Sequence, residues 1–135
     1  MTYPRLYILV RNDMDSMNSG KAIAQGAHAA TKFVYECALD KHLSKSVDDW
    51  QKQGDGFGTK ISLAVNNEEQ LLGIVDSAKS MSIPANLVLD PTYPVRDGSV
   101  VHLIPVITAA YVFVRNEQDH INMNSTAMVS LSLYP

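Results

Sequence analysis

The residues with the most evident chemistry are Lys21, Gln25 and His28, which carry a cation, an amide and an imidazole. In a helix their spacing places them on one face, because each residue advances the helix by about 100°. A lysine in the first turn is unfavourable to the helix dipole, so its position favours a further role beside a phosphate or a developing oxyanion. Taken singly, each side chain also fits an ordinary solvated or partly buried helix position. The pattern therefore predicts a candidate site, with a plain helix surface as the alternative.

A helix is predicted to present these three side chains. Asn18 or Ser19 is placed to cap it, and the predicted range is 20–39. Most of the other residues in its first half are alanine or glycine, which suit close packing against a sheet better than the filling of a core. A short apolar run at 5–11, bounded by Pro4 and by Asn12-Asp13, predicts a buried strand just before it.

One segment of the chain resembles the opening of the class 2 peptidyl-tRNA hydrolases, a family common in archaea and eukaryotes. The resemblance rests on the strand at 6–11, then Asn12-Asp13-Met14, and then Gly20-Lys21-x-x-Ala24-Gln25-x-x-His28-Ala29. It implies an enzyme without a cofactor that cleaves the ester between a peptide, or an N-blocked amino acid, and the 3′ end of tRNA. Peptidyl-tRNA is then the partner, and a homodimer is the assembly that the family suggests.

Asp90 is the second place where the resemblance assigns a role. The family has an aspartate here, followed by Ala-Gly and, four residues after the aspartate, by an active-site threonine. This chain continues Pro91-Thr92-Tyr93-Pro94 instead, so Pro94 occupies the threonine position and Thr92 is taken as its substitute. The alternative for Asp90 is a turn residue before a proline at the end of a strand. The candidate site residues are Lys21, Gln25, His28, Asp90 and Thr92.

Ester hydrolysis at such a site needs a placed water and a charge that stabilises the tetrahedral oxyanion. Lys21 suits the second task, and Gln25 suits orientation of the carbonyl or the water. Either His28 or Asp90 could accept the proton. In a third alternative, Asp90 pairs with Lys21 and fixes its position. No Gly-x-Ser-x-Gly occurs and Cys37 has no activating neighbour, so direct attack by water is preferred to an acyl-enzyme.

Composition sets the wider bounds. The 135 residues, 46% hydrophobic and 19% charged, indicate one globular domain over 1–135. No apolar run reaches the ~20 residues of a membrane span, and the first residues are unlike a signal peptide, so a cytoplasmic protein is expected. The single cysteine, Cys37, excludes an intramolecular disulfide and is expected to be buried. The histidines lack ligand spacing, so no metal site is assigned.

The formal net charge of −3 bears on function, because proteins that hold RNA by its phosphates usually present a basic face. Total charge does not fix the distribution, however, because Arg11, Lys21 and Lys32 lie near the motif while many acids fall elsewhere. The acidic balance predicts, at most, weak and salt-sensitive RNA binding. Two rival functions follow. One is a noncatalytic module that binds RNA, a nucleotide or a protein, and the other is a hydrolase of another acylated nucleotide or small ester.

The remaining pattern predicts an α/β fold. After the first helix, a short helix is expected from Ser44 or Ser46 with Val47 and Trp50 inward, then a plain glycine-rich turn at 53–58. The further predictions are strands at 59–65, 85–89, 108–114 and 128–134, a helix at 68–80 capped by Asn66 or Asn67, a hairpin turn at Asp97-Gly98, and a polar turn at 115–124. This order indicates a single three-layer domain, with a mixed, mostly parallel β-sheet of about four or five strands and helices on both faces. Sites in such folds lie at the carboxyl ends of strands, which brings Asp90 toward Lys21 and Gln25.

Overall fold

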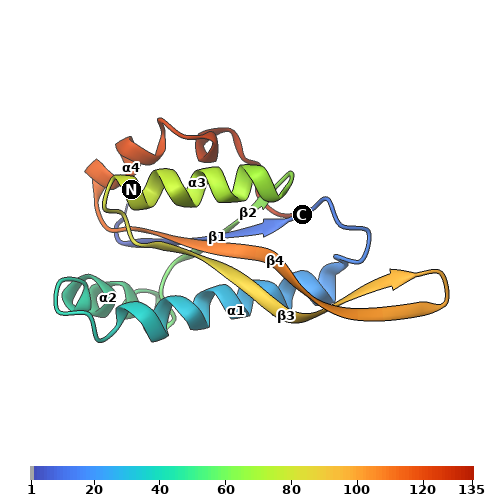
Figure 1. Cartoon of the computed structure of the whole chain (residues 1–135). Coiled ribbons are helices and arrows are strands. Elements are labelled where there is room, and N and C mark those ends of the chain that lie inside the picture. Colours follow the sequence, from blue (N-terminus) through green and yellow to red (C-terminus); the bar gives the residue numbers. More distant parts are fainter. Residues whose placement is uncertain (1) are drawn as a thin grey trace.

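A four-stranded mixed sheet forms the middle layer of the protein (Figure 1). The computed structural model describes residues 2–135. The strands are β1 (Arg5–Arg11), β2 (Lys60–Val65), β3 (Ala85–Asp97) and β4 (Val100–Val114). Their spatial order is β2-β1-β4-β3, with β1 parallel to β2 and β4 antiparallel to both β1 and β3. The α/β class, the mixed sheet and the helices on both faces are therefore confirmed.

The prediction of a mostly parallel sheet is wrong for neighbouring strands. Strands β1, β2 and β3 do run in one direction, as the alternation of strands and helices requires. The hairpin turn at Gly98, whose φ is +60°, sends the chain straight back, and β4 takes the position between β1 and β3. Only the β1–β2 contact is consequently parallel among the strands of residues 2–135. Sequence periodicity does not specify which strands become neighbours, so this insertion was not anticipated.

Helices α1 (Ser19–Cys37) and α2 (Ser44–Gln51) cover one face of the sheet (Figure 1). Asn18 caps α1 by accepting a hydrogen bond from the backbone N of Lys21 at 3.0 Å, as expected. The predicted serine cap of α2 is wrong, because Leu43 precedes that helix and offers no side-chain bond. Phe33 of α1 packs edge-on against Trp50 of α2, with 5.1 Å between the ring centroids. Cys37 is buried in the same layer, as predicted.

The glycine-rich segment is a turn, in agreement with the sequence. It holds a short 3₁₀ turn at Gly54–Gly56, and Gly58 follows it with φ +75°. A Cβ at position 58 would overlap the ring of Trp50, whose Nε1 donates to the carbonyl oxygen of Thr59 at 2.8 Å. The backbone of this loop thus packs directly against the Trp50 indole, which belongs to the layer formed by α1 and α2.

The opposite face of the sheet is covered by α3 (Glu68–Ser80), α4 (Glu117–Met123) and a 3₁₀ turn at Ala127–Ser130. The predicted bounds of α3 are confirmed, with Asn67 as the cap. The polar turn predicted at 115–124 is wrong, because Asn116 caps a short helix there. The terminal strand predicted at 128–134 is also wrong, and a single bridge between Leu63 and Leu133 stands in its place. Within residues 2–135 no helix has the length and apolar character to span a bilayer.

Strands β3 and β4 continue past the body of the protein as a long hairpin (Figure 1). The strand predicted at 85–89 therefore extends to Asp97, and Asp90 lies inside it. Between Asp90 and Tyr93 the pairing shifts, so that two residues of β3 lie opposite Pro105 alone. Pro91 and Pro105 have no backbone N–H to pair, and a bulge at this place turns the side chain of Asp90 toward α1.

Candidate functional site

Gln25 lies at the centre of a hydrogen-bonded chain that joins α1, β3 and β4. Its Nε2 donates to Oδ2 of Asp90 at 2.7 Å, and its Oε1 accepts from Oγ1 of Thr108 at 2.6 Å. The Gln25 side chain is buried, with 3% of the residue exposed, and Thr108 is fully buried. An ionised carboxylate only accepts, so the amide nitrogen must face Asp90 and the amide oxygen must face Thr108. The orientation of Gln25, and through it that of Asp90, is thereby fixed.

The pKa of Asp90 is lowered from its ordinary value of 3.8. Burial opposes the charged form, but the hydrogen bonds from Gln25 and from the backbone N of Thr92 outweigh it, and His28 adds a favourable charge interaction. The second bond joins the Thr92 nitrogen to Oδ1 of Asp90 at 3.0 Å. Asp90 is therefore a carboxylate at neutral pH, held on both oxygens by uncharged donors.

Lys21 lies one helical turn before Gln25 on the same side of α1. Its Nζ is 5.9 Å from the centre of the Tyr93 ring, in the range of a cation–π contact. Tyr93 is fully buried, and its hydroxyl accepts from Oγ of Ser16 at 2.9 Å. Lys21 forms no ion pair with Asp90 or with any other acid among residues 2–135. The hypothesis that Asp90 pairs with Lys21 is wrong, since Asp90 binds the Gln25 amide instead.

His28 is one turn beyond Gln25 and is exposed. Together with Asp90, Lys32 and Pro91 it lines a small cavity of about 280 Å³. Lys32 there donates to the carbonyl oxygen of Leu87 at 2.6 Å, so its ammonium is held by the backbone of β3. The imidazole and the carboxylate thus border one space that a water molecule or a small group can enter.

Thr92 meets Asp90 through its backbone nitrogen, and its side chain is exposed. A side-chain hydrogen bond from Thr92 also helps to lower the pKa of Asp90. The structure thus brings the five predicted residues to one stretch of α1 and β3, with the exposed Thr92 side chain at its edge. Pro94, which stands where the family has a threonine, lines the neighbouring larger cavity. A proline supplies no hydroxyl there.

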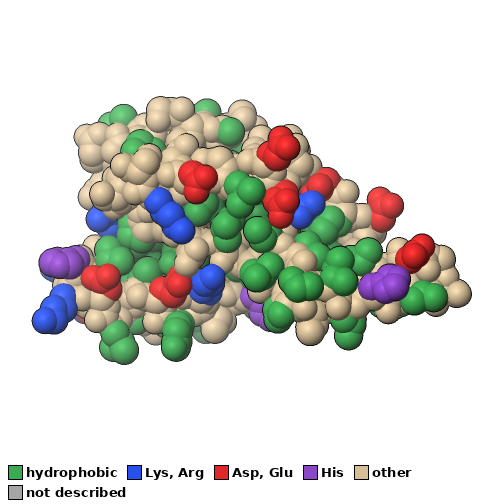
Figure 2. Space-filling model, viewed as in Figure 1, with side chains coloured by type: hydrophobic (Ala, Val, Ile, Leu, Met, Phe, Trp, Pro, Cys, Tyr) green, Lys and Arg blue, Asp and Glu red, His purple; other side chains and the backbone are tan. Residues whose placement is uncertain are grey.

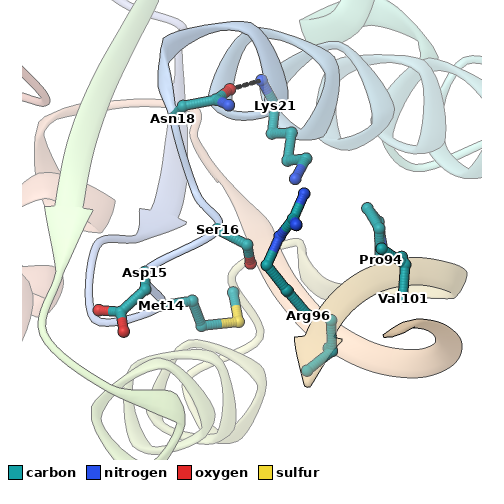
Figure 3. A pocket seen from close by; sticks show the side chains of 9 residues that line it. Met14, Asp15, Ser16, Asn18, Lys21, Pro94, Arg96 and Val101 are labelled. Carbon is teal, nitrogen blue, oxygen red and sulfur yellow. Dashed lines mark hydrogen bonds between the residues drawn. The ribbon is translucent and has the colours of Figure 1, made fainter. Parts of the chain in front are cut away.

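The larger cavity, of about 650 Å³, opens beside Lys21 between the start of α1 and the hairpin. Figure 3 shows Lys21 and Arg96 entering it from opposite sides, with Ser16 and Asn18 from the loop before α1. Pro94 and Val101 form its apolar wall on the hairpin. The cavity therefore combines two cations with an apolar wall, and Lys21, one helical turn before Gln25 on α1, connects it to the Gln25 and Asp90 network.

Basic side chains near the motif differ in their freedom to meet a ligand. Arg11 pairs with Asp13 at 2.9 Å and also donates to the carbonyl oxygen of Ile107. That contact raises the pKa of Arg11 and lowers that of Asp13, chiefly through their side-chain hydrogen bonds. Arg11 and Lys32 are thus bound by other groups of the protein, whereas Lys21 forms no ion pair among residues 2–135 and faces the larger cavity. The basic cluster expected from sequence is reduced to Lys21, with Arg96 added by the hairpin.

Sequence reasoning missed Thr108 and Arg96. Thr108 is the first residue of a run predicted as a strand, and a threonine at a strand start carries no local signal of a partner 83 residues away. Arg96 directly precedes the hairpin turn predicted at Asp97-Gly98. The sequence does place Arg96 on a hairpin, because it lies four residues before an apolar run that follows the turn. Nothing in that run indicates that the hairpin lies next to α1.

Comparison with known proteins decides the family. A model of the family described as "Peptidyl-tRNA hydrolase PTH2" matches residues 4–105. The chain belongs to this family. It is similar to the peptidyl-tRNA hydrolase of Methanocaldococcus jannaschii, at 32% identity over 88 residues that cover 64% of this chain and 70% of that protein. The peptidyl-tRNA hydrolase of Sulfolobus acidocaldarius is 34% identical over 87 residues, covering 64% and 71% of the two chains.

A eukaryotic relative extends the comparison. The "Probable peptidyl-tRNA hydrolase 2" of Dictyostelium discoideum is 34% identical over 84 residues, which cover 62% of this chain and 37% of that protein. The resemblance inferred from the first motif is therefore confirmed, and it extends through β3 into the hairpin. The matched range of the PTH2 family ends before Thr108, so the partner of the Gln25 oxygen lies in the part of the chain beyond it.

Proposed function

We propose that the protein hydrolyses the ester bond between a peptide, or an N-blocked amino acid, and the 3′ end of tRNA, and so recycles tRNA from abandoned translation. Membership of the PTH2 family supports this activity. The observation that carries it to particular residues is the hydrogen bond from Gln25 to Asp90 beside Lys21. The substrate is peptidyl-tRNA, and the reaction is a carboxylic ester hydrolysis by water.

Lys21 stabilises the oxyanion in this proposal. Its ammonium has no carboxylate partner within residues 2–135 and lies at the edge of a cavity beside Gln25. One preorganised donor of this kind contributes about 2.7–4 kcal/mol to the transition state, or 10²–10³ in turnover. Its contact with the Tyr93 ring holds the ammonium in place without neutralising it.

Asp90 orients the attacking water, and His28 accepts its proton. The lowered pKa of Asp90 makes its carboxylate a good hydrogen-bond acceptor but a weak base at neutral pH. Histidine is the side chain suited to proton transfer near neutrality, and His28 borders the same small cavity as Asp90. Gln25 is a positioning residue, because both of its polar atoms are held by Thr108 and Asp90. Thr92 contributes its backbone nitrogen to Asp90.

The test is release of free tRNA from N-acetylated aminoacyl-tRNA by the purified chain. Lys21→Ala and Asp90→Asn should each lower kcat by about 10²-fold or more, while thermal unfolding stays close to that of the unaltered protein. Lys41→Ala, an exposed lysine after α1, is the matched control and should leave turnover unchanged. Absence of turnover in the unaltered chain would support the alternative, a noncatalytic RNA-, nucleotide- or protein-binding module.

The role of His28 has its own test. His28→Gln should lower kcat by about tenfold or more, with KM little changed. Full activity of His28→Gln would show that Asp90, and not His28, accepts the proton. A cytoplasmic location and a homodimeric assembly are proposals from the family alone. Light scattering coupled to size-exclusion chromatography tests the homodimer.

A further inference from the structure

We propose that Arg96 binds the 5′-phosphate of the terminal nucleotide of the substrate and so positions the ester at Lys21. This inference rests on the proposed hydrolase function. Arg96 lies on the hairpin, and its guanidinium points into the larger cavity toward Lys21 (Figure 3). Because the reacting ester joins the ribose of the last nucleotide, a group that binds the phosphate of that nucleotide fixes the ribose between itself and the site.

Two cations that face one cavity without an acid between them indicate an anionic ligand. Neither Lys21 nor Arg96 has an ion pair among residues 2–135. Asp15 is the acidic residue that lines the cavity, and Figure 3 shows its carboxylate directed away from both cations. The acid next to Arg96, Asp97, lies 3.7 Å from Nε2 of His102 across the hairpin. Like charges that face one cavity repel each other, and an anion between them removes that cost.

Other arginines of the chain show what an arginine without a ligand role does. Arg11 binds Asp13, and Arg115 binds Asp119 at 2.7 Å and also donates to the carbonyl oxygen of Ser82. Both guanidiniums are satisfied by the fold itself. Arg96 instead lies over a cavity, on a strand whose backbone is already paired to Val101. Its side chain is thus free to meet a phosphate, which a planar guanidinium can hold with two parallel hydrogen bonds.

The cavity has room and chemistry for a nucleotide. Its volume of about 650 Å³ is within the usual range for small-molecule sites. Pro94, Val101 and Met14 give it apolar walls for a ribose and base, while Ser16 and Asn18 offer polar groups. Lys21 faces Arg96 across this cavity and lies one helical turn before Gln25, which binds Asp90. A phosphate at Arg96 would thus direct the ribose and the ester toward Lys21.

The experiment compares binding of adenosine 5′-monophosphate and adenosine by calorimetry. The unaltered chain should bind the monophosphate about tenfold or more tightly, and Arg96→Gln should remove that preference while leaving adenosine binding unchanged. Lys41→Gln, which removes an exposed charge away from the cavity, should keep the preference. Arg96 is exposed, so Arg96→Gln is expected to fold, which circular dichroism checks.

A kinetic readout separates this inference from the proposed function. With N-acetylated aminoacyl-tRNA, Arg96→Gln should raise KM, retain kcat, and lessen the slope of log kcat/KM against log salt by about 0.7 to 0.9. Equal affinity of the unaltered chain for adenosine and its 5′-monophosphate, or an Arg96→Gln variant that keeps the preference, overturns the phosphate site even where turnover is present. An Arg96-dependent preference without turnover supports the phosphate site and refutes the hydrolase.

Discussion

Two clusters of partly or fully buried polar groups lie along and just after β4, and their acidic residues differ in the donors that they bind. At Thr108 the chain of hydrogen bonds runs through Gln25 to Asp90. Just beyond the strand, Arg115 meets Asp119 through its Nε, its Nη2 and its backbone nitrogen. Asp119 is buried and paired with a full positive charge, whereas Asp90 is half-buried and bonded to an amide and a backbone nitrogen.

The difference shows how to separate structural charge from functional charge. Asp119 uses both oxygens on one neighbouring arginine, which raises the pKa of Arg115 mainly through their side-chain hydrogen bond. Such a pair is complete and has no affinity left for a ligand. Asp90 keeps its charge unneutralised at the edge of a cavity, and Lys21 and Arg96 keep theirs a short way along. Ionised groups held by neutral donors are therefore the ones to examine for chemistry.

Breaking the structural cluster should give the largest change in stability. Asp119→Ala removes three hydrogen bonds to Arg115, so the free energy of unfolding should fall by about 3 kcal/mol with kcat/KM unchanged. Urea unfolding and the tRNA release assay measure the two effects. Asp48→Ala breaks an exposed pair with Lys52 and should leave stability unaltered. A loss of activity in folded Asp119→Ala would show that the two clusters are coupled.

Thr108→Val should have a smaller effect on stability and a visible effect on activity. It leaves the buried Oε1 of Gln25 without its donor, which costs about 1–2 kcal/mol of unfolding free energy. Because Gln25 then loses one of the two bonds that orient it, kcat should fall about 3- to 10-fold. Thr108→Ser keeps the hydroxyl and should restore kcat. If Thr108→Val instead retains full kcat, Gln25 does not position Asp90.

The smallest expected effect is a change in the titration of Asp90. In the folded protein its pKa is below 3.8, so its contacts stabilise the fold above that pH and lose this contribution as the pH falls through the lowered pKa. Gln25→Leu keeps the volume but removes a hydrogen bond to the carboxylate, and the midpoint should move to higher pH. Carbon NMR of the Asp90 carboxyl group measures both midpoints. An unchanged midpoint would mean that Gln25 does not hold the charged form.

Local signals in the sequence predicted those parts of the fold that local contacts determine. The bounds of β1 and α3 followed from a bounded apolar run and from an asparagine cap with acids in the first turn. Helix α4 was missed because seven mostly polar residues have little periodicity, although Asn116 followed by Asp119 is a cap signal. The position of β4 depends on pairing with β1 across about a hundred residues, which no window along the sequence contains.

For the candidate site, the sequence supplied residue types but not their partners. Lys21, Gln25, His28 and Asp90 were singled out by spacing and by family resemblance, and the fold places them along one stretch of α1 and β3. That Gln25 binds Asp90, and that Asp90 does not bind Lys21, depends on a bulge at Pro91 which shifts the register. The resemblance itself could not anticipate the cation on the hairpin, because the family's loop after the aspartate continues with Ala-Gly and a threonine.

The place of β4 in the sheet has a consequence for synthesis of the chain on the ribosome. Among the strands described, β3 has β4 as its neighbour, so residues 85–97 have no edge to pair with until residues 100–114 have emerged. Strand β1 and strand β2 can join earlier. Gln25 is synthesised early, but its buried amide oxygen has no donor from Thr108 until that residue has been synthesised. A nascent chain of this protein therefore acquires its site late in translation, and a chain halted near residue 100 would expose the apolar face of α1.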